Sequence, residues 1–141
     1  MGLLVDTSVW SLAYRRDTPP NLPEVLALRR ALTSGDRVVT TGMILLELLR
    51  GFVPPKAQET IRAAFEPLEL AEPTREDYVA AARLSNECRR AGVQLGSVDA
   101  LIAQMAIAGE HTLLTTDQDF HLARSAIALN VWRPPAAGDL T

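Results

Sequence analysis

Four acidic residues occupy positions where an α/β protein could gather them into one reaction centre. Asp6 directly follows the apolar run LLV near the N-terminus, and Asp117 follows the run TLLTT. Asp99 lies at the start of the apolar helical pattern SVDALIAQMA, and Glu47 is the only charged residue within MILLELL. Because ligands of open α/β sheets bind outside the carboxyl ends of the strands, these acids are expected to meet where a site would lie.

The chemistry of such a cluster follows from its charge. Converging carboxylates repel each other strongly unless cations lie between them. Oxygen ligands without a His or Cys cluster select hard cations such as Mg²⁺ or Mn²⁺. Such a cation completes its shell with substrate phosphate oxygens and stabilises the leaving oxygen of an in-line displacement. The residues alone therefore indicate metal-dependent phosphoryl chemistry.

Each acid also has an ordinary structural explanation. Asp6 and Asp117 could cap helices, which stabilises a helix by about 1 kcal/mol. Asp99 could complement a helix dipole, and Glu47 could pair with Arg50 on the next turn. A carboxylate in a helix that is apolar almost all round is rare unless it is paired or functional, because such a helix is normally buried. Four acids on four different elements are harder to explain by structure alone.

The elements that must position these acids are predicted by short apolar runs that alternate with helical patterns. Most of the runs are continuous, which is typical of parallel strands covered on both faces. The predicted strands are Leu3–Val5, Arg37–Thr40, Leu68–Leu70, Thr112–Thr115 and Ala126–Val131. This alternation predicts a three-layer α/β/α fold with a mainly parallel central sheet of about five strands.

Helical patterns are clearest in three of the intervening segments. One apolar stripe ends before Gly35, a residue typical of helix C-termini. Thr74 and Asp77 form a capping-box pattern that predicts a helix through Arg90. Another stripe predicts a helix over Ser97–Gly109. Each stripe predicts a helix face packed on the core.

The composition indicates one soluble globular domain. The chain has 141 residues, of which 48% are hydrophobic and 22% charged, so its core needs no disulfides. The single cysteine, Cys88, favours a reducing compartment, and we therefore expect a cytoplasmic protein. No apolar run is long enough to span a membrane, and Asp6 interrupts the N-terminal run, which argues against a signal peptide. We expect one domain over residues 1–133 and a flexible C-terminal tail over 134–141.

Four segments carry a resemblance to a known family. LLVDTSVW, ILLELLRG, VDALIA and LLTTDQDF occur in the order and approximate spacing of PIN-domain ribonucleases. The sequence is most similar to the VapC toxins of type II toxin–antitoxin modules, from Leu3 to about Trp132. The resemblance implies a PIN-like fold and a Mg²⁺-dependent endoribonuclease, for which Mn²⁺ can substitute. It also implies cleavage of structured RNA, often transfer RNA, and neutralisation by a cognate antitoxin.

The resemblance also implies roles for individual residues. Asp6, Glu47, Asp99 and Asp117 match the acidic catalytic quartet of the family, with Asp6 and Asp99 as its most consistent metal ligands. Asp117 would complete the metal shell or hold a second ion. Glu47 would bind through water or help to orient the attacking water. Asp119 matches the second acid of the last segment, whose role varies in the family.

Hydroxyl side chains beside the acids match the same segments. Thr7 and Ser8 follow the first acid, and Thr115 belongs to the last segment. Their hydroxyls could order the pocket by hydrogen bonds.

Basic and aromatic residues give a weaker indication of an RNA partner. The doublets Arg15-Arg16, Arg29-Arg30 and Arg89-Arg90 could contact phosphates, although solvated helix faces are the commoner role of such doublets. Trp10, Tyr14 and Trp132 could stack on bases, although packing in the core or in a dimer is the commoner role. The net charge of −3 counts against bulk electrostatic binding of nucleic acid. Five of the 17 acids belong to the proposed site, however, which leaves 12 acids against 14 basic residues elsewhere.

Two other classes of protein stay open as alternatives. One is another Mg²⁺-dependent phosphohydrolase or phosphoacceptor α/β domain. Ser8 stands where a phosphatase signature would place a second Asp, and Lys56 is the only lysine that a phosphoacceptor domain could use. The other is a non-catalytic PIN-like interaction module, against which the intact acids argue. The apolar segment ILLELLRGFVPP also predicts a homodimer contact.

Overall fold

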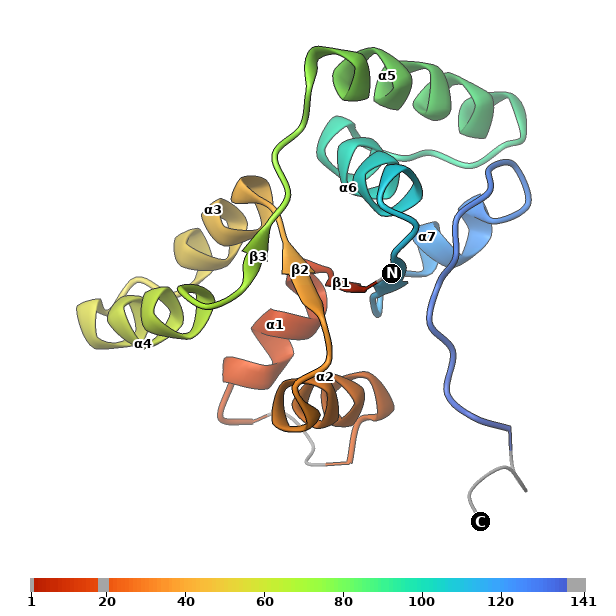
Figure 1. Ribbon diagram of the computed structural model, residues 1–141. Helices are drawn as coiled ribbons and strands as arrows, with labels where there is room; N and C mark the ends of the chain where they lie inside the picture. Colours follow the sequence, from red (N-terminus) through yellow and green to blue (C-terminus); the bar gives the residue numbers. More distant parts are fainter. Residues whose placement is uncertain (1, 18–20, 137–141) are drawn as a thin grey trace.

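Short strands alternate with longer helices along the chain, as the computed structural model shows (Figure 1). The structure describes residues 2–17 and 21–136. Its elements are β1 (Leu3–Val5), α1 (Thr7–Tyr14), α2 (Pro23–Ser34), β2 (Val38–Thr40), α3 (Gly42–Gly51), α4 (Pro55–Phe65), β3 (Glu69–Leu70), α5 (Arg75–Arg90), α6 (Ser97–Ala108), β4 (Thr112–Leu114) and α7 (Gln118–Ala123). The predicted α/β fold with a parallel sheet is confirmed.

The sheet has four parallel strands in the order β3-β2-β1-β4. Strand β1 is therefore central, and Leu4 pairs with Val39 on one side and with Leu113 on the other. Helices α1 and α2 lie on one side of the sheet and α5 and α6 on the other, which gives the three layers (Figure 1). Because all strands run the same way, their carboxyl ends share one edge.

The predicted strand over Ala126–Val131 is wrong except at one position. Val131 forms an isolated parallel bridge with Leu113, outside any regular strand. The amides of the first two residues of this segment donate to the carbonyl of Ala123 and so close the end of α7. Those amides are consequently unavailable to a sheet ladder, and the sheet has four strands rather than five.

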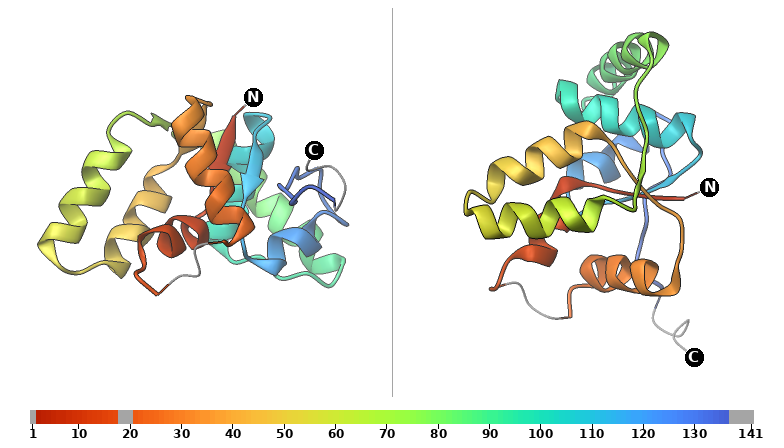
Figure 2. Two further views of the ribbon diagram at one scale, coloured as in Figure 1. Left: turned by 90° about the horizontal axis from the view of Figure 1, so that it is seen from below. Right: turned by 60° about the vertical axis from the view of Figure 1, so that its left-hand side comes forward.

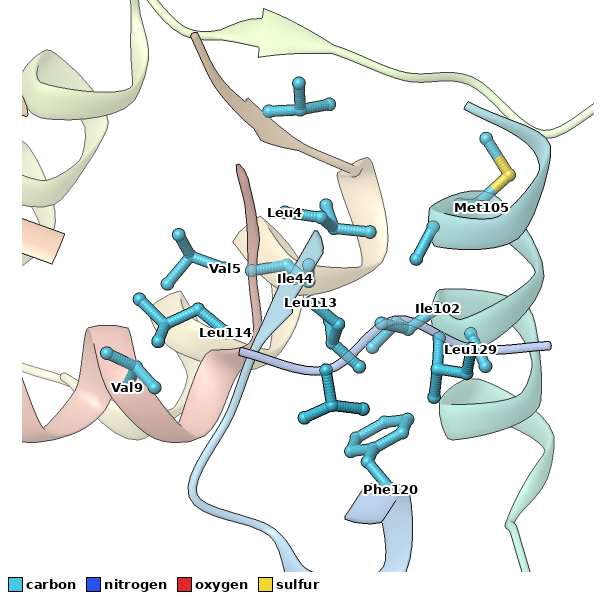
Figure 3. Packing of buried hydrophobic residues seen from close by; sticks show 14 of the residues in the cluster. Leu4, Val5, Val9, Ile44, Ile102, Met105, Leu113, Leu114, Phe120 and Leu129 are labelled. Atoms are coloured by element: carbon cyan, nitrogen blue, oxygen red, sulfur yellow. The ribbon is translucent and has the colours of Figure 1, made fainter. Parts of the chain in front are cut away.

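The core lies between the sheet and its covering helices. Leu4 and Leu113 from neighbouring strands are fully buried, as are Ile102 of α6 and Phe120 of α7. Figure 3 shows these side chains filling the space between the strands and the two helices. Each buried side chain of this size contributes roughly 1.5–3 kcal/mol. This packing supports the loops that follow the strands at the carboxyl edge of the sheet.

Helix α3 is less buried than its composition predicts. Only Ile44 and Leu48 are buried in it, whereas Leu46 is 52% exposed. The reason is its place in the fold: α3 and α4 form a hairpin that projects beyond the sheet (Figures 1 and 2). Glu47 is therefore half-buried rather than enclosed in the core.

The C-terminal tail predicted over 134–141 is described only in part. Residues 134–136 are exposed, and the rest of the predicted tail lies outside the described residues. Across the described parts of the chain, no helix combines the length and apolar character that a membrane crossing requires.

Candidate active site

The structure places the four predicted acids around the carboxyl edge of the sheet. Asp6 follows β1 and Asp117 follows β4, its neighbour in the sheet. Asp99 lies in the first turn of α6, and Glu47 lies on α3. Burial, and then the negative charges of the other three acids and of Asp119, raise the pKa of Asp99. The fold thus brings together the residues that the sequence singled out.

Asp6 is the most deeply placed of these acids, with only 6% of its surface exposed. The hydroxyls of Ser8 and Thr115 both donate to its Oδ2 atom, each at 2.8 Å. Burial raises the pKa of Asp6, and these hydrogen bonds offset part of that effect because they favour the charged form. The two hydroxyls were predicted to order the pocket by hydrogen bonds, and the group that they bind is the carboxylate of Asp6.

The same hydroxyls attach the loop after β4 to the end of β1. Thr115 Oγ1 accepts a hydrogen bond from the amide of Asp117 at 3.0 Å. Ser8 Oγ accepts one from the amide of Thr116 at 3.2 Å. The position of Asp117 is thus coupled to that of Asp6 through two small side chains. Residue type alone gave no indication of Thr116, because its contribution is a backbone amide.

Thr7 links helix α1 to Glu47. Its hydroxyl donates to Glu47 Oε1 at 2.9 Å, across two helices that pack side by side. The alternative pairing with Arg50 is not formed among the described residues. Glu47 is therefore held by a neutral donor, and no ion pair among the described residues cancels its charge.

Asp117 combines the capping role and the site role that the sequence left open. Its Oδ1 accepts the amide of Asp119 at 2.9 Å, which caps α7. The opposite oxygen makes no hydrogen bond to the described residues. The acids thus share a pattern, because Asp6 and Glu47 also take their side-chain hydrogen bonds on one oxygen only.

Asp99 is the acid on which the charges act most strongly. Its pKa rises from 3.8 to about 6, first because of burial and then because of the charges of Asp6, Asp117, Glu47 and Asp119. A carboxyl with a pKa near 6 loses its proton close to neutral pH. The site therefore carries negative potential that no basic side chain among the described residues neutralises by an ion pair.

A divalent cation fits this donor set. As the side chains stand, no three acidic, His or Cys groups in the described chain lie close enough together to hold one ion directly. Mg²⁺ commonly binds through one or two carboxylates and keeps several waters, so it does not need such a triad. Each of Asp6, Glu47 and Asp117 has one carboxylate oxygen without a side-chain hydrogen bond, and Asp99 lies in their combined field.

Comparison with known proteins shows the family of the chain. Residues 3–125 match the family described as PIN domain. The chain belongs to the PIN domain family. Part of this PIN domain is similar to Ribonuclease VapC23 of Mycobacterium tuberculosis, at 36% identity over 62 residues. That match covers 44% of this chain and 49% of VapC23, about half the length of each protein.

Solved structures share the fold over nearly the whole chain. VapBC2 from Rickettsia felis, bound to a DNA fragment from its promoter, superposes with a TM-score of 0.74 at 19% identity. That superposition covers 96% of this PIN domain and all of the matched chain. VapC20 of Mycobacterium tuberculosis, a Sarcin-Ricin loop cleaving toxin, superposes with a TM-score of 0.64 at 17% identity, over 90% of this chain and 98% of its own.

The raised pKa of Asp99 predicts how stability depends on pH without metal. The folded state binds its proton more tightly than the unfolded state does, so the free energy of unfolding falls as pH rises from about 4 to 6. Asp99→Asn should remove this loss and stabilise the metal-free protein at pH 7 by something on the order of 1 kcal/mol, given screening by solvent. Urea unfolding in chelator at several pH values measures the difference.

Asp77→Asn is a suitable control for this experiment. Its pKa is lowered by the amide of Thr74, so its contribution to stability is present above pH 3.8 and is lost only at more acidic pH. The difference between wild type and Asp77→Asn should stay flat between pH 5 and 7, because this window lies above the pKa of Asp77 in both the folded and the unfolded state. A flat difference for Asp99→Asn as well would contradict the predicted repulsion.

Proposed function

We propose that this PIN domain is a metal-dependent endoribonuclease, the toxin component of a VapBC-type toxin–antitoxin module. It would hydrolyse phosphodiester bonds in transfer RNA or another structured RNA. The observation that carries the proposal is the placement of Asp6, Glu47, Asp99 and Asp117 on four elements around one edge of the sheet. The similarity to a ribonuclease, VapC23, supports the same activity.

Mg²⁺ is the proposed cofactor, and Mn²⁺ would substitute for it. Asp6, Asp99 and Asp117 would hold the cation, one or two of them directly and the others through its bound waters, because Mg²⁺ prefers oxygen ligands and keeps several waters. When bound, it would activate water and stabilise the charge that develops on the leaving oxygen. The chain's own residues supply the rest of the chemistry.

Those residues orient the reacting groups. Thr115 and Ser8 donate to the Oδ2 atom of Asp6 and so hold its carboxylate in one orientation. Thr7 fixes Oε1 of Glu47, so that Oε2 can accept a hydrogen bond from the attacking water and align it with the phosphate. Because these donors are already in place, little reorganisation is needed when RNA binds.

The proposed activity predicts a strict dependence on metal and on Asp99. Purified protein should cut a transfer RNA pool with Mg²⁺ or Mn²⁺ and stop in chelator. Asp99→Asn should lower kcat/KM at least roughly 100-fold, because it removes a charge from the cation site. Asp36→Asn, an exposed acid before β2 at the opposite edge of the sheet, should leave the rate unchanged. Cleavage that persists in chelator or in Asp99→Asn would exclude the metal mechanism.

The crowded acids also predict the chemistry of an inhibitory partner. We propose a cognate antitoxin that inserts basic side chains between the carboxylates, as a cation would. A chain of the VapBC2 complex has the same fold, which supports an antitoxin partner. The product of the neighbouring gene should therefore co-purify with the chain and block cleavage. It should bind Asp99→Asn more weakly than Asp36→Asn. A neighbour that neither binds nor inhibits would remove the toxin assignment and leave the nuclease in place.

A homodimer is proposed through the projecting hairpin. Leu46 is 52% exposed and Val53 is 76% exposed, on the apolar segment that the sequence singled out. Packing of these side chains against a second copy of the chain would remove them from water. Light scattering at micromolar concentration should give the mass of a dimer for the wild type and of a monomer for Leu46→Glu. Leu122→Glu, equally exposed on α7, should stay dimeric. A monomeric wild type would reject the dimer.

A further inference from the structure

A groove of about 700 Å³ lies where the end of α1 meets the α3–α4 hairpin. We call it the Tyr14 groove. Its lining combines aromatic, aliphatic and basic side chains from three segments: Tyr14, Arg15, Arg16, Asp17, Phe52, Pro54, Lys56, Ala57, Thr60 and Ile61. The sequence had singled out Tyr14 and the arginine doublet separately, and the fold brings them together with the only lysine of the chain.

The rim of the Tyr14 groove is positively charged. Arg15, Arg16 and Lys56 are exposed there, against the single carboxylate of Asp17. None of the three cations forms an ion pair with a carboxylate of the described residues. The chain as a whole has a net charge of −3, so these three side chains form a local concentration of positive charge. It offers several donors to phosphate oxygens.

The floor of the groove is aromatic and held in place. The rings of Tyr14 and Phe52 meet edge to face, with centroids 6.2 Å apart. On its other side, Tyr14 stacks on buried Trp10 at 6.4 Å. A ring fixed in this way loses little entropy when a base stacks on it. Aromatic rings flanked by cations are the combination that binds single-stranded nucleic acid.

Helix α1 sets the distance between the groove and the acids. It begins directly after Asp6 and ends at Tyr14, so the two sites are about 10 Å apart along its axis. A stacked strand advances about 3.4 Å per nucleotide and covers this distance in about three nucleotides. On the other side of the groove, Phe52 directly follows α3 and lies about 7.5 Å from Glu47 along the axis of that helix.

We propose that the Tyr14 groove binds the single-stranded flank of the RNA substrate, about three nucleotides from the scissile phosphate. The inference rests on the proposed ribonuclease function and adds a substrate subsite to it. The three cations contact phosphates of the flank, and Tyr14 and Phe52 support its bases. A protein segment basic enough to neutralise the acid cluster would be repelled by these same cations, which favours RNA as the occupant.

The salt dependence of RNA binding tests this subsite. Affinity of a 12-nucleotide single-stranded RNA carrying a non-cleavable linkage is measured by fluorescence anisotropy at several salt concentrations. Arg15→Gln/Arg16→Gln should weaken binding roughly tenfold at low salt and reduce the slope of log K against log salt by about 1.4, because two phosphate contacts are lost. Lys56→Gln should reduce the slope by about half as much, because only one phosphate contact is lost.

A matched pair serves as the control. Arg29→Gln/Arg30→Gln removes the same charge from α2, where Arg30 lies beside Gly2 and Leu3 at the opposite edge of the sheet. The proposal is overturned if both double variants lose the same RNA affinity. It is also overturned if the groove variants keep the wild-type slope of log K against log salt. A groove pair that binds RNA normally but loses the partner protein overturns it as well, since the groove would then be a protein-docking surface.

Cleavage kinetics separate this inference from the function on which it rests. With a cleavable RNA, the groove pair should raise KM and leave kcat unchanged, because the acids are untouched. The effect should vanish for a substrate too short to reach the groove. If wild type cuts RNA but the groove pair keeps its KM, the subsite is wrong and the nuclease stands. If wild type binds RNA through the groove but cuts none, the nuclease is wrong.

Discussion

The crowding of negative charge at one edge of the sheet is the constraint around which this PIN domain is organised. Because β1 and β4 are neighbouring parallel strands, the residues after them must emerge side by side, and these residues are Asp6 and Asp117. Helix α6 adds Asp99 to the same place. A fold driven only by stability would not gather carboxylates there, since each charge raises the cost of the next. Such crowding is typical of a site built for a cation.

Small hydroxyl side chains lower the energetic cost of burying a charged carboxylate in this arrangement. Ser8 and Thr115 each donate to Asp6 and also accept a backbone amide from the loop after β4. One pair of side chains therefore compensates a buried charge and fixes the loop that carries Asp117. The compensation is incomplete, because burial still raises the pKa of Asp6. A ligand that relieves the remaining repulsion would bind only the folded state and would therefore stabilise it.

The sequence predicted the parts of the molecule that depend on local patterns. Strands β1 and β4 end where the apolar runs end, so Asp6 and Asp117 could be placed at strand ends. The capping box of Thr74 and Asp77 forms as predicted, with both reciprocal hydrogen bonds. These features depend on residues near one another in the chain, and their patterns carry over directly to the structure.

Predictions that depended on distant packing were less accurate. Helix α3 was expected to be buried because of its composition, but the hairpin projects beyond the sheet and Leu46 is exposed. The run 126–131 has the composition of a strand, yet its first amides are used to close α7. The Thr7–Glu47 contact joins residues 40 positions apart. In each case, neighbours that the local pattern does not specify decide the outcome.

The charge of the acid cluster differs in sign from that of the rest of the chain. Outside the five acids of the site, the chain has 12 acidic and 14 basic residues, so the rest of the chain is weakly positive. A polyanion would be repelled by the bare acids and attracted by Arg15, Arg16 and Lys56. Because α1 is rigid, the distance from Tyr14 to Asp6 is fixed. A strand held at the proposed subsite would therefore reach the acids at a set number of nucleotides, and position along the strand would help to determine where cleavage occurs.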